Sequence, residues 1–88
     1  MYSYLVEFLG ALFFIYVILA TGNPLAIGAA LALVILVTSS ISGGHINPAV
    51  SITMASAGKL PIGQVLPYCL AQILGGLTAL QVYKRYQL

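Results

Sequence analysis

Two long runs without a charged residue constrain this chain more than any other feature of its sequence. Residues 8–58 contain no Asp, Glu, Lys or Arg, and neither do residues 60–83. Hydrophobic residues make up 61% of the 88 positions and charged residues 5%, whereas a typical soluble domain carries roughly 25% charged residues. An ordinary soluble domain and a disordered chain are therefore excluded, and the mean hydropathy of +1.09 indicates a protein that resides in lipid.

The few charged and reactive residues argue against several functions. Nucleic-acid binding needs a basic patch, and the three cations, Lys59, Lys84 and Arg85, are too few to form one. A disulfide scaffold needs paired cysteines, and Cys69 is the only cysteine. Neither a nucleophile–base pair nor a cluster of metal ligands is recognisable, so we expect no enzyme activity, metal or cofactor. The expected partner is the lipid bilayer rather than nucleic acid, and the host membrane stays open.

Three segments are predicted to cross the membrane as helices, because a span needs roughly 20 apolar residues. They cover about residues 4–20, 25–41 and 61–83. Residues 21–24 (TGNP) form a strong turn sequence between the first two spans, and the third begins at a proline, which suits a first helical position. A cleaved signal peptide is the alternative for the first segment, but the basic start and the cleavage site are missing.

The segment at residues 42–57 is too polar for lipid and too apolar for water. Gly43 and Gly44 disfavour a continuous helix, whereas Asn47 is a good N-cap and Pro48 a good first helical residue. A helix from Pro48 to the end of this segment would be about 15 Å long, half the core of a bilayer. We therefore predict a re-entrant loop and half-helix, which must be buried in protein or line a wet cavity. The alternative is an amphipathic helix on the membrane surface, although it would lack Lys and Arg on its polar face.

Together these predictions describe an all-α membrane protein with three transmembrane helices and one re-entrant half-helix. The segment Gly43-Gly44-His45-Ile46-Asn47-Pro48-Ala49-Val50 resembles the first NPA loop of the aquaporin and glycerol-facilitator (major intrinsic protein) family. An NPA tripeptide alone would be a weak signal. The match is wider, because residues 6–10 (VEFLG), 26–28 (AIG) and 67–76 (PYCLAQILGG) resemble the family's first, second and third helices, in that order.

The resemblance implies half of an aquaporin-like fold, with residues 1–88 as one half-repeat. Members of the family contain two inverted repeats, each with three spans and one NPA half-helix, and this chain is similar to the first. A pore would need a second half-repeat, either an antiparallel copy in a homodimer or higher oligomer, or a separate second-repeat protein. Lys59 on one side of the membrane nearly balances Lys84 and Arg85 on the other, which leaves single and dual topology open.

The resemblance also implies an activity, the passive passage of water and small neutral solutes such as glycerol. The Asn47 side chain would donate hydrogen bonds to the passing solute, and Pro48 and Ala49 would hold two half-helices in contact. The helix N-termini, which are partly positive, would oppose cations. The pore-lining acceptors would be the backbone carbonyls of Gly43, Gly44 and His45.

Four further residues receive roles from the resemblance. Glu7 and Gln72 lie inside predicted spans and are expected to support the loop through hydrogen bonds. The family's narrow filter uses an arginine after the second NPA motif, but Val50 follows the motif here. The filter position of the second helix, often aromatic in the family, matches Ile27. An apolar filter of this kind predicts passage of glycerol as well as water.

Two other functions stay open at this point. The chain could be a non-conducting structural or accessory membrane subunit derived from half of an aquaporin. It could also be a proton antiporter like the small multidrug transporters, which are short and carry a glutamate in the first span. Those proteins have four spans and no NPA loop. A start at Met1 and an end after Lys84 and Arg85 are expected of a complete chain, although a fragment of a longer protein fits as well.

Overall fold

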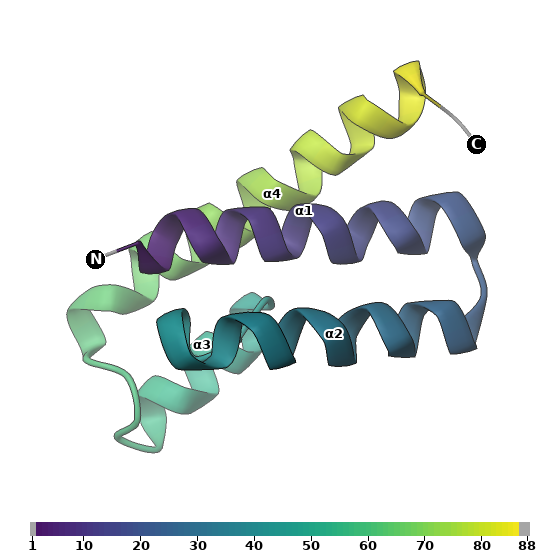
Figure 1. Ribbon diagram of the computed structural model, residues 1–88. Coiled ribbons are helices and arrows are strands. Elements are labelled where there is room, and N and C mark those ends of the chain that lie inside the picture. The colour runs from purple at the N-terminus through teal and green to yellow at the C-terminus, as the bar shows by residue number, and fades with distance from the viewer. Residues whose placement is uncertain (1, 87–88) are drawn as a thin grey trace.

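The computed structural model describes residues 2–86, and within them all regular structure is helical. Its elements are α1 (Ser3–Thr21), α2 (Pro24–Ser42), α3 (Pro48–Ser56), a short 3-10 turn η1 (Ile62–Gln64) and α4 (Val65–Arg85) (Figure 1). Three helical segments are long and apolar enough to cross a membrane, namely α1, α2 and η1 with α4. The predicted fold class, an all-α protein with three such helices, is confirmed.

Local capping signals define the hairpin of α1 and α2. Gly22 takes a left-handed conformation with φ of 55°, and its N–H donates to the Ile18 carbonyl at 3.0 Å. The Asn23 side-chain oxygen then accepts hydrogen bonds from the N–H groups of Leu25 and Ala26, at 2.9 and 3.0 Å. Pro24 follows as the first helical residue. The two helices are therefore joined by a very short turn and run antiparallel side by side (Figure 1).

The short helix α3 is capped at both ends by hydrogen bonds to residues within it or directly next to it. At its start, the Asn47 side-chain oxygen accepts a hydrogen bond from the Ala49 N–H at 2.8 Å. At its end, the Gly58 N–H donates to the Ala55 carbonyl and the Lys59 N–H donates to the Met54 carbonyl, at 3.1 and 2.8 Å. This is a Schellman motif, and Gly58 supplies its left-handed residue with φ of 78°. The nine residues of α3 give a length of about 14 Å, half the thickness of a bilayer core.

The third span begins differently from the expected α-helix at residue 61. Residues Ile62–Gln64 form the 3-10 turn η1, and α-helix starts only at Val65. Pro67 explains the difference, because it has no N–H to donate to the Gly63 carbonyl and its ring crowds that carbonyl. An α-helical first turn would need this bond, so the chain enters α4 through the tighter turn instead.

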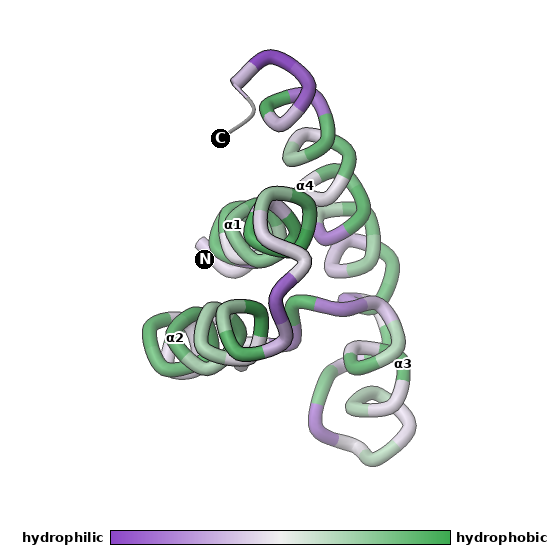
Figure 2. Tube along the Cα trace, turned by 90° about the vertical axis from the view of Figure 1, so that its right-hand side faces the viewer, coloured by the Kyte–Doolittle hydropathy of each residue, from purple (hydrophilic) through white to green (hydrophobic). Residues whose placement is uncertain are grey.

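Helix α1 is the centre of the packing. It contacts α2 and, more extensively, α4, while α3 contacts α4 (Figure 2). The closest approach of α1 and α4 is at Gly75, where an added Cβ would collide with the Phe8 carbonyl oxygen and lie 3.1 Å from Ala11 Cβ. Small residues at such crossings are typical of helices that pack in lipid.

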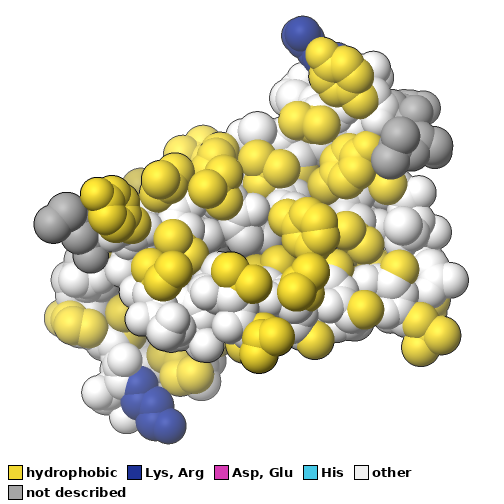
Figure 3. Space-filling view, in the orientation of Figure 1, with side chains coloured by type: hydrophobic (Ala, Val, Ile, Leu, Met, Phe, Trp, Pro, Cys, Tyr) yellow, Lys and Arg dark blue, Asp and Glu magenta, His cyan; other side chains and the backbone are white. Residues whose placement is uncertain are grey.

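The distribution of polarity is the reverse of that in a soluble protein. Hydrophobic side chains cover the visible face, and Lys and Arg appear only at two opposite ends of it (Figure 3). The exposed residues include many leucines and isoleucines along all three long helices. Among residues 2–86, six polar side chains are buried, namely Glu7, Thr38, Ser42, His45, Ser51 and Gln72. Most of these polar groups surround the segment between α2 and α3.

Candidate functional site

The carboxylate of Glu7 is the centre of the buried polar cluster. Glu7 is 0% exposed and extends from α1 towards the segment between α2 and α3. Its Oε2 accepts hydrogen bonds from Ser42 Oγ at 2.6 Å and from the His45 N–H at 3.1 Å. Its Oε1 accepts from the Ile46 N–H and from Gln72 Nε2, both at 2.7 Å. A carboxylate offers about four acceptor sites, so this environment satisfies the charged form and joins α1, α2, the loop and α4.

These donors determine where three backbone carbonyls point. The N–H groups of His45 and Ile46 face Glu7, and the Gly44 N–H donates to Ser42 Oγ at 3.3 Å. All three peptide bonds are trans, so each carbonyl points opposite to the N–H of the same peptide unit. The carbonyls of Gly44 and His45 therefore point away from Glu7, and the carbonyl of Gly43 points away from Ser42 Oγ, which is itself bonded to Glu7. We call them the carbonyl row, and within residues 2–86 none of them accepts a hydrogen bond.

Positive φ angles make this orientation possible. Gly43 and Gly44 have φ of 90° and 64°, in the region that L-residues rarely adopt. Ile46 also has φ of 64°, and no other non-glycine residue in the described part of the chain has a positive φ. The loop is therefore held in a conformation that its backbone alone would disfavour.

Asn47 follows the loop and presents an amide group at the surface. Its side chain is exposed, with Oδ1 occupied by the Ala49 N–H. Nδ2 makes no hydrogen bond to any described residue and remains available as a donor. Asn47 also precedes the N-terminus of α3, which carries about half a positive charge. Capping and presentation of a donor are compatible roles for this one side chain.

His45 and Gln72 meet at Ser51, which the sequence analysis did not single out. Ser51 is 0% exposed, and its Oγ lies 2.8 Å from His45 Nδ1 and accepts from Gln72 Nε2 at 2.9 Å. Because Gln72 donates to this oxygen, the Ser51 hydrogen is free to bond to His45 Nδ1. The loop is thereby attached to α3 and α4 as well as to α1.

Tyr68 and Ser42 are two further contributors that sequence reasoning missed. The Tyr68 hydroxyl donates to the Ser42 carbonyl at 2.8 Å, and its ring centroid lies 5.1 Å from that of His45. Serine and tyrosine carry no functional signal by themselves. A usable signal was the spacing of Tyr68 and Gln72, since residues four apart share one face of a helix.

We expect Tyr68→Phe to lower the free energy of unfolding by about 1 kcal/mol, the typical value of one hydrogen bond. The Ser42 carbonyl would lose its side-chain donor in a place where little water can replace it. Unfolding in detergent micelles would measure the change. Tyr83→Phe is the control, since Tyr83 makes no hydrogen bond to the described residues. Equal losses in the two variants would show that the Tyr68 hydroxyl is not a specific support.

The predicted filter residues lie away from this cluster. Ile27 is half-buried in the first turns of α2, near the turn at residues 21–24. Val50 is 37% exposed on α3 and lines a shallow hollow of about 270 Å³ with Ala49, Thr53 and Met54. Helices α2 and α3 make no extensive contact, so the chain alone does not close a ring around Ile27 and Val50. Pro48 is half-buried beside them.

Metal ligands are not gathered anywhere in the part of the chain that the structure describes. No three His, Cys, Asp or Glu side chains in residues 2–86 lie close enough to hold one ion. The buried histidine and glutamate are both engaged with the loop and its neighbours.

An apolar exterior around a buried polar cluster, with three long apolar helices, defines an integral multi-pass membrane protein. The sequence model of the family described as Major intrinsic protein matches residues 1–87. The chain belongs to the major intrinsic protein family, as the resemblance at the NPA loop predicted. This membership is incompatible with the small multidrug transporter alternative.

Curated relatives agree with this family. Glycerol uptake facilitator protein-like 6 of Lactiplantibacillus plantarum is 37% identical over 98% of this chain and 44% of its own length. Aquaporin Z of Bradyrhizobium diazoefficiens is 39% identical over 69% of this chain and 25% of its own. Aquaporin Lacbi1:233199 of Laccaria bicolor is 51% identical over 57% of this chain and 19% of its own. The chain thus spans less than half the length of these relatives.

Proposed function

We propose that this chain forms one half of a passive channel for water and small neutral solutes such as glycerol. Members of its family are channels rather than enzymes, which supports channel function in general. The observation that carries the finer proposal is the carbonyl row followed directly by the free amide group of Asn47. Free acceptors next to a free donor suit a solute that both donates and accepts hydrogen bonds.

In the proposed mechanism, the carbonyls of Gly43, Gly44 and His45 accept hydrogen bonds from successive water or alcohol hydroxyl groups. Asn47 Nδ2 then donates to the oxygen of the solute at the start of α3. This donor fixes the orientation of the solute, while the positive end of the helix dipole repels cations. Both effects oppose conduction of ions and protons, as in other pores lined by half-helix ends.

A second half-repeat has to complete the pore. The N-terminal end of α3 is open, since Asn47, Ala49 and Val50 are all exposed and α2 makes no extensive contact with α3. The partner that we propose is a second copy in antiparallel orientation, because inverted repeats build many transport proteins around a central site. One cation, Lys59, lies on one side and two, Lys84 and Arg85, lie on the other, which is a small topological bias. The rest of a longer chain, or a separate protein, would supply the same missing half.

The proposed pore has an apolar filter. Two copies would contribute two Ile27 and two Val50 side chains and no fixed cation near the NPA motifs. A charged group in a filter would bind water in preference to the carbon skeleton of a solute. The apolar ring proposed here lacks such a group. We therefore propose that glycerol passes in addition to water.

Osmotic swelling and shrinkage of proteoliposomes that contain only this chain would test the proposal. We expect water flux in a sucrose gradient and glycerol flux in a glycerol gradient, both well above those of protein-free vesicles. Asn47→Asp is expected to lower both about tenfold or more, because it removes the donor and adds a charge in the pore. Asp caps a helix as well as Asn does, so α3 should persist.

Ser56→Ala is the control for this experiment, since the Ser56 hydroxyl is exposed and bonds only to the Ile52 carbonyl at 3.0 Å. Water flux without glycerol flux would contradict the apolar filter. If inserted and folded protein shows neither flux, the antiparallel pair is wrong. A separate second half or a non-conducting accessory role would then take its place.

A further inference from the structure

Ile46 combines a disfavoured backbone with a fully enclosed side chain. A β-branched residue at φ of 64° is strained, whereas glycines occupy the other positive-φ positions of this loop. A glycine at position 46 would adopt this backbone more easily. The isoleucine side chain is 3% exposed, so its contacts are what distinguishes it from glycine.

The Ile46 side chain fits a site on α1 and α2 that consists of Gly10, Ala11 and Val34, which we call the Ile46 socket. Ala11, Val34 and Ile46 form one buried cluster. Gly10 admits the end of the side chain, because a Cβ added there would lie 2.6 Å from Ile46 Cδ1 but 3.9 Å from Ile46 Cγ1. The space at Gly10 is therefore matched to the terminal methyl group of isoleucine.

Helix α1 thus holds Ile46 at two points. Glu7 Oε1 accepts from the Ile46 N–H at 2.7 Å, and Gly10 and Ala11, three and four residues further along, receive its side chain. Residues at these spacings share one face of a helix. The hydrogen bond aligns the Ile46 N–H and, with it, the opposed His45 carbonyl. The side-chain contact fixes the Cβ of Ile46, so the strained φ cannot relax by turning this peptide unit away from Glu7.

We propose that Ile46 is a positioning residue of the channel, and that its side chain in the Ile46 socket keeps the carbonyl row turned away from Glu7. Without the side-chain contact, relaxation of the strained φ at Ile46 would compete with the hydrogen bonds of the loop to Glu7. The proposal rests on the proposed channel function for its permeability readout, and the local order of the loop provides a second, independent readout.

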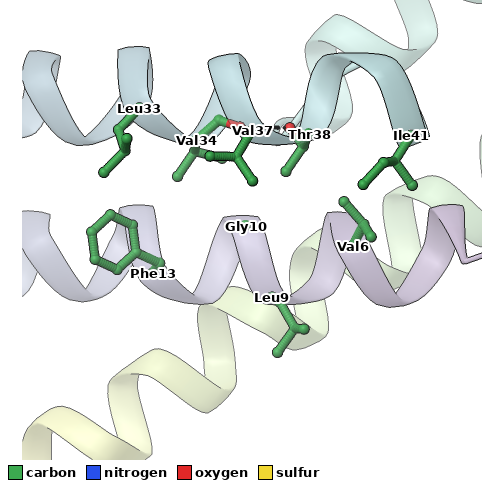
Figure 4. Close-up of a pocket in the computed structure, with 9 residues that line it drawn as sticks. All are labelled: Val6, Leu9, Gly10, Phe13, Leu33, Val34, Val37, Thr38 and Ile41. Carbon is green, nitrogen blue, oxygen red and sulfur yellow. Dashed lines mark hydrogen bonds between the residues drawn. The ribbon is translucent and has the colours of Figure 1, made fainter.

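A size-swap experiment tests the proposal. We expect Gly10→Ala to lower water permeability several-fold in proteoliposomes and to speed hydrogen exchange at the His45 and Ile46 amides, because its Cβ displaces Ile46 Cδ1. Adding Ile46→Val removes that methyl group and should restore most of both properties. Val34 Cγ1 would lie 3.0 Å from the new Cβ and must shift slightly; Val34 lines an open groove between α1 and α2 (Figure 4).

Ile46→Gly provides a second variant that does not depend on crowding. It relieves the backbone strain but empties the Ile46 socket, so we expect faster amide exchange and lower permeability with unchanged helix content. Wild-type behaviour of Ile46→Gly, or failure of Ile46→Val to rescue Gly10→Ala, would overturn the proposal. If the wild-type protein does not conduct by itself, the antiparallel pair is wrong, and amide exchange in the same variants still decides whether the Ile46 socket orders the loop.

Discussion

Glu7→Gln is expected to abolish channel activity and to lower the free energy of unfolding by about 3 kcal/mol. The carboxylate accepts from four donors, two of them backbone N–H groups of the loop. An amide of the same shape keeps one acceptor atom and points an NH₂ group at donors on the other side. A buried donor that loses its acceptor costs about 1–3 kcal/mol, and more than one is affected here. Proteoliposome flux and unfolding in micelles would measure the two effects.

Thr78→Val is the control for Glu7→Gln. It also removes a side-chain hydrogen bond within a spanning helix, from Thr78 Oγ1 to the Leu74 carbonyl at 2.7 Å, but this bond is local to α4. We expect the control to keep both flux and stability. A Glu7→Gln protein with wild-type stability and flux would mean that the loop does not depend on a charged acceptor.

Gly75→Ala is expected to destabilise the protein by about 2 kcal/mol through overpacking. The added Cβ would meet the Phe8 carbonyl oxygen, which belongs to the backbone of α1 and cannot rotate away. The contact of α1 with α4 is the most extensive between the described helices, so α4 would have to move as a unit. That movement would carry Gln72 away from Glu7 and Ser51. Thermal unfolding in micelles would report the loss.

Gly28→Ala makes the same chemical change in another spanning helix. Nothing lies within 4 Å of a Cβ at Gly28, and alanine favours helix over glycine by about 0.5–1 kcal/mol. We expect this variant to be as stable as the wild-type protein or slightly more so. Similar losses in the two variants would show that the effect comes from the helices themselves and not from the crossing at Gly75.

The features that were predictable from the sequence are those with local causes. The three spans follow from the length of the charge-free runs, and their confirmation needed no knowledge of packing. Asn47 and Pro48 indicate the start of the half-helix, and Gly58 indicates its end. Each cap joins residues only a few positions apart, so the chain order already brings the partners together. The 3-10 turn before α4 is the exception, although its cause, Pro67, is also local.

The site roles of Asn47, Pro48, Ala49, Ile27 and Val50 stay predictions, because they concern a partner half that this chain does not contain. The structure places Glu7 and Gln72 beside the loop, and it adds Ser42, Ser51 and Tyr68 around them. Those three residues are chemically ordinary. Nothing in their identity distinguishes them from the exposed serines and tyrosines elsewhere in the chain.

The sequence by itself determined that this protein resides in a lipid bilayer. It also determined the spanning helices, the half-helix and the family. Hydropathy and capping act within one segment, and family membership depends on the order of motifs along one chain. Only the tertiary structure decided that Glu7 collects donors from residues 35 to 65 positions away, and that the carbonyl row points outward. Those outcomes depend on how α1, α2 and α4 approach one another, at Gly10 and Gly75 above all. Such distances and angles between segments are not encoded in any single stretch of residues.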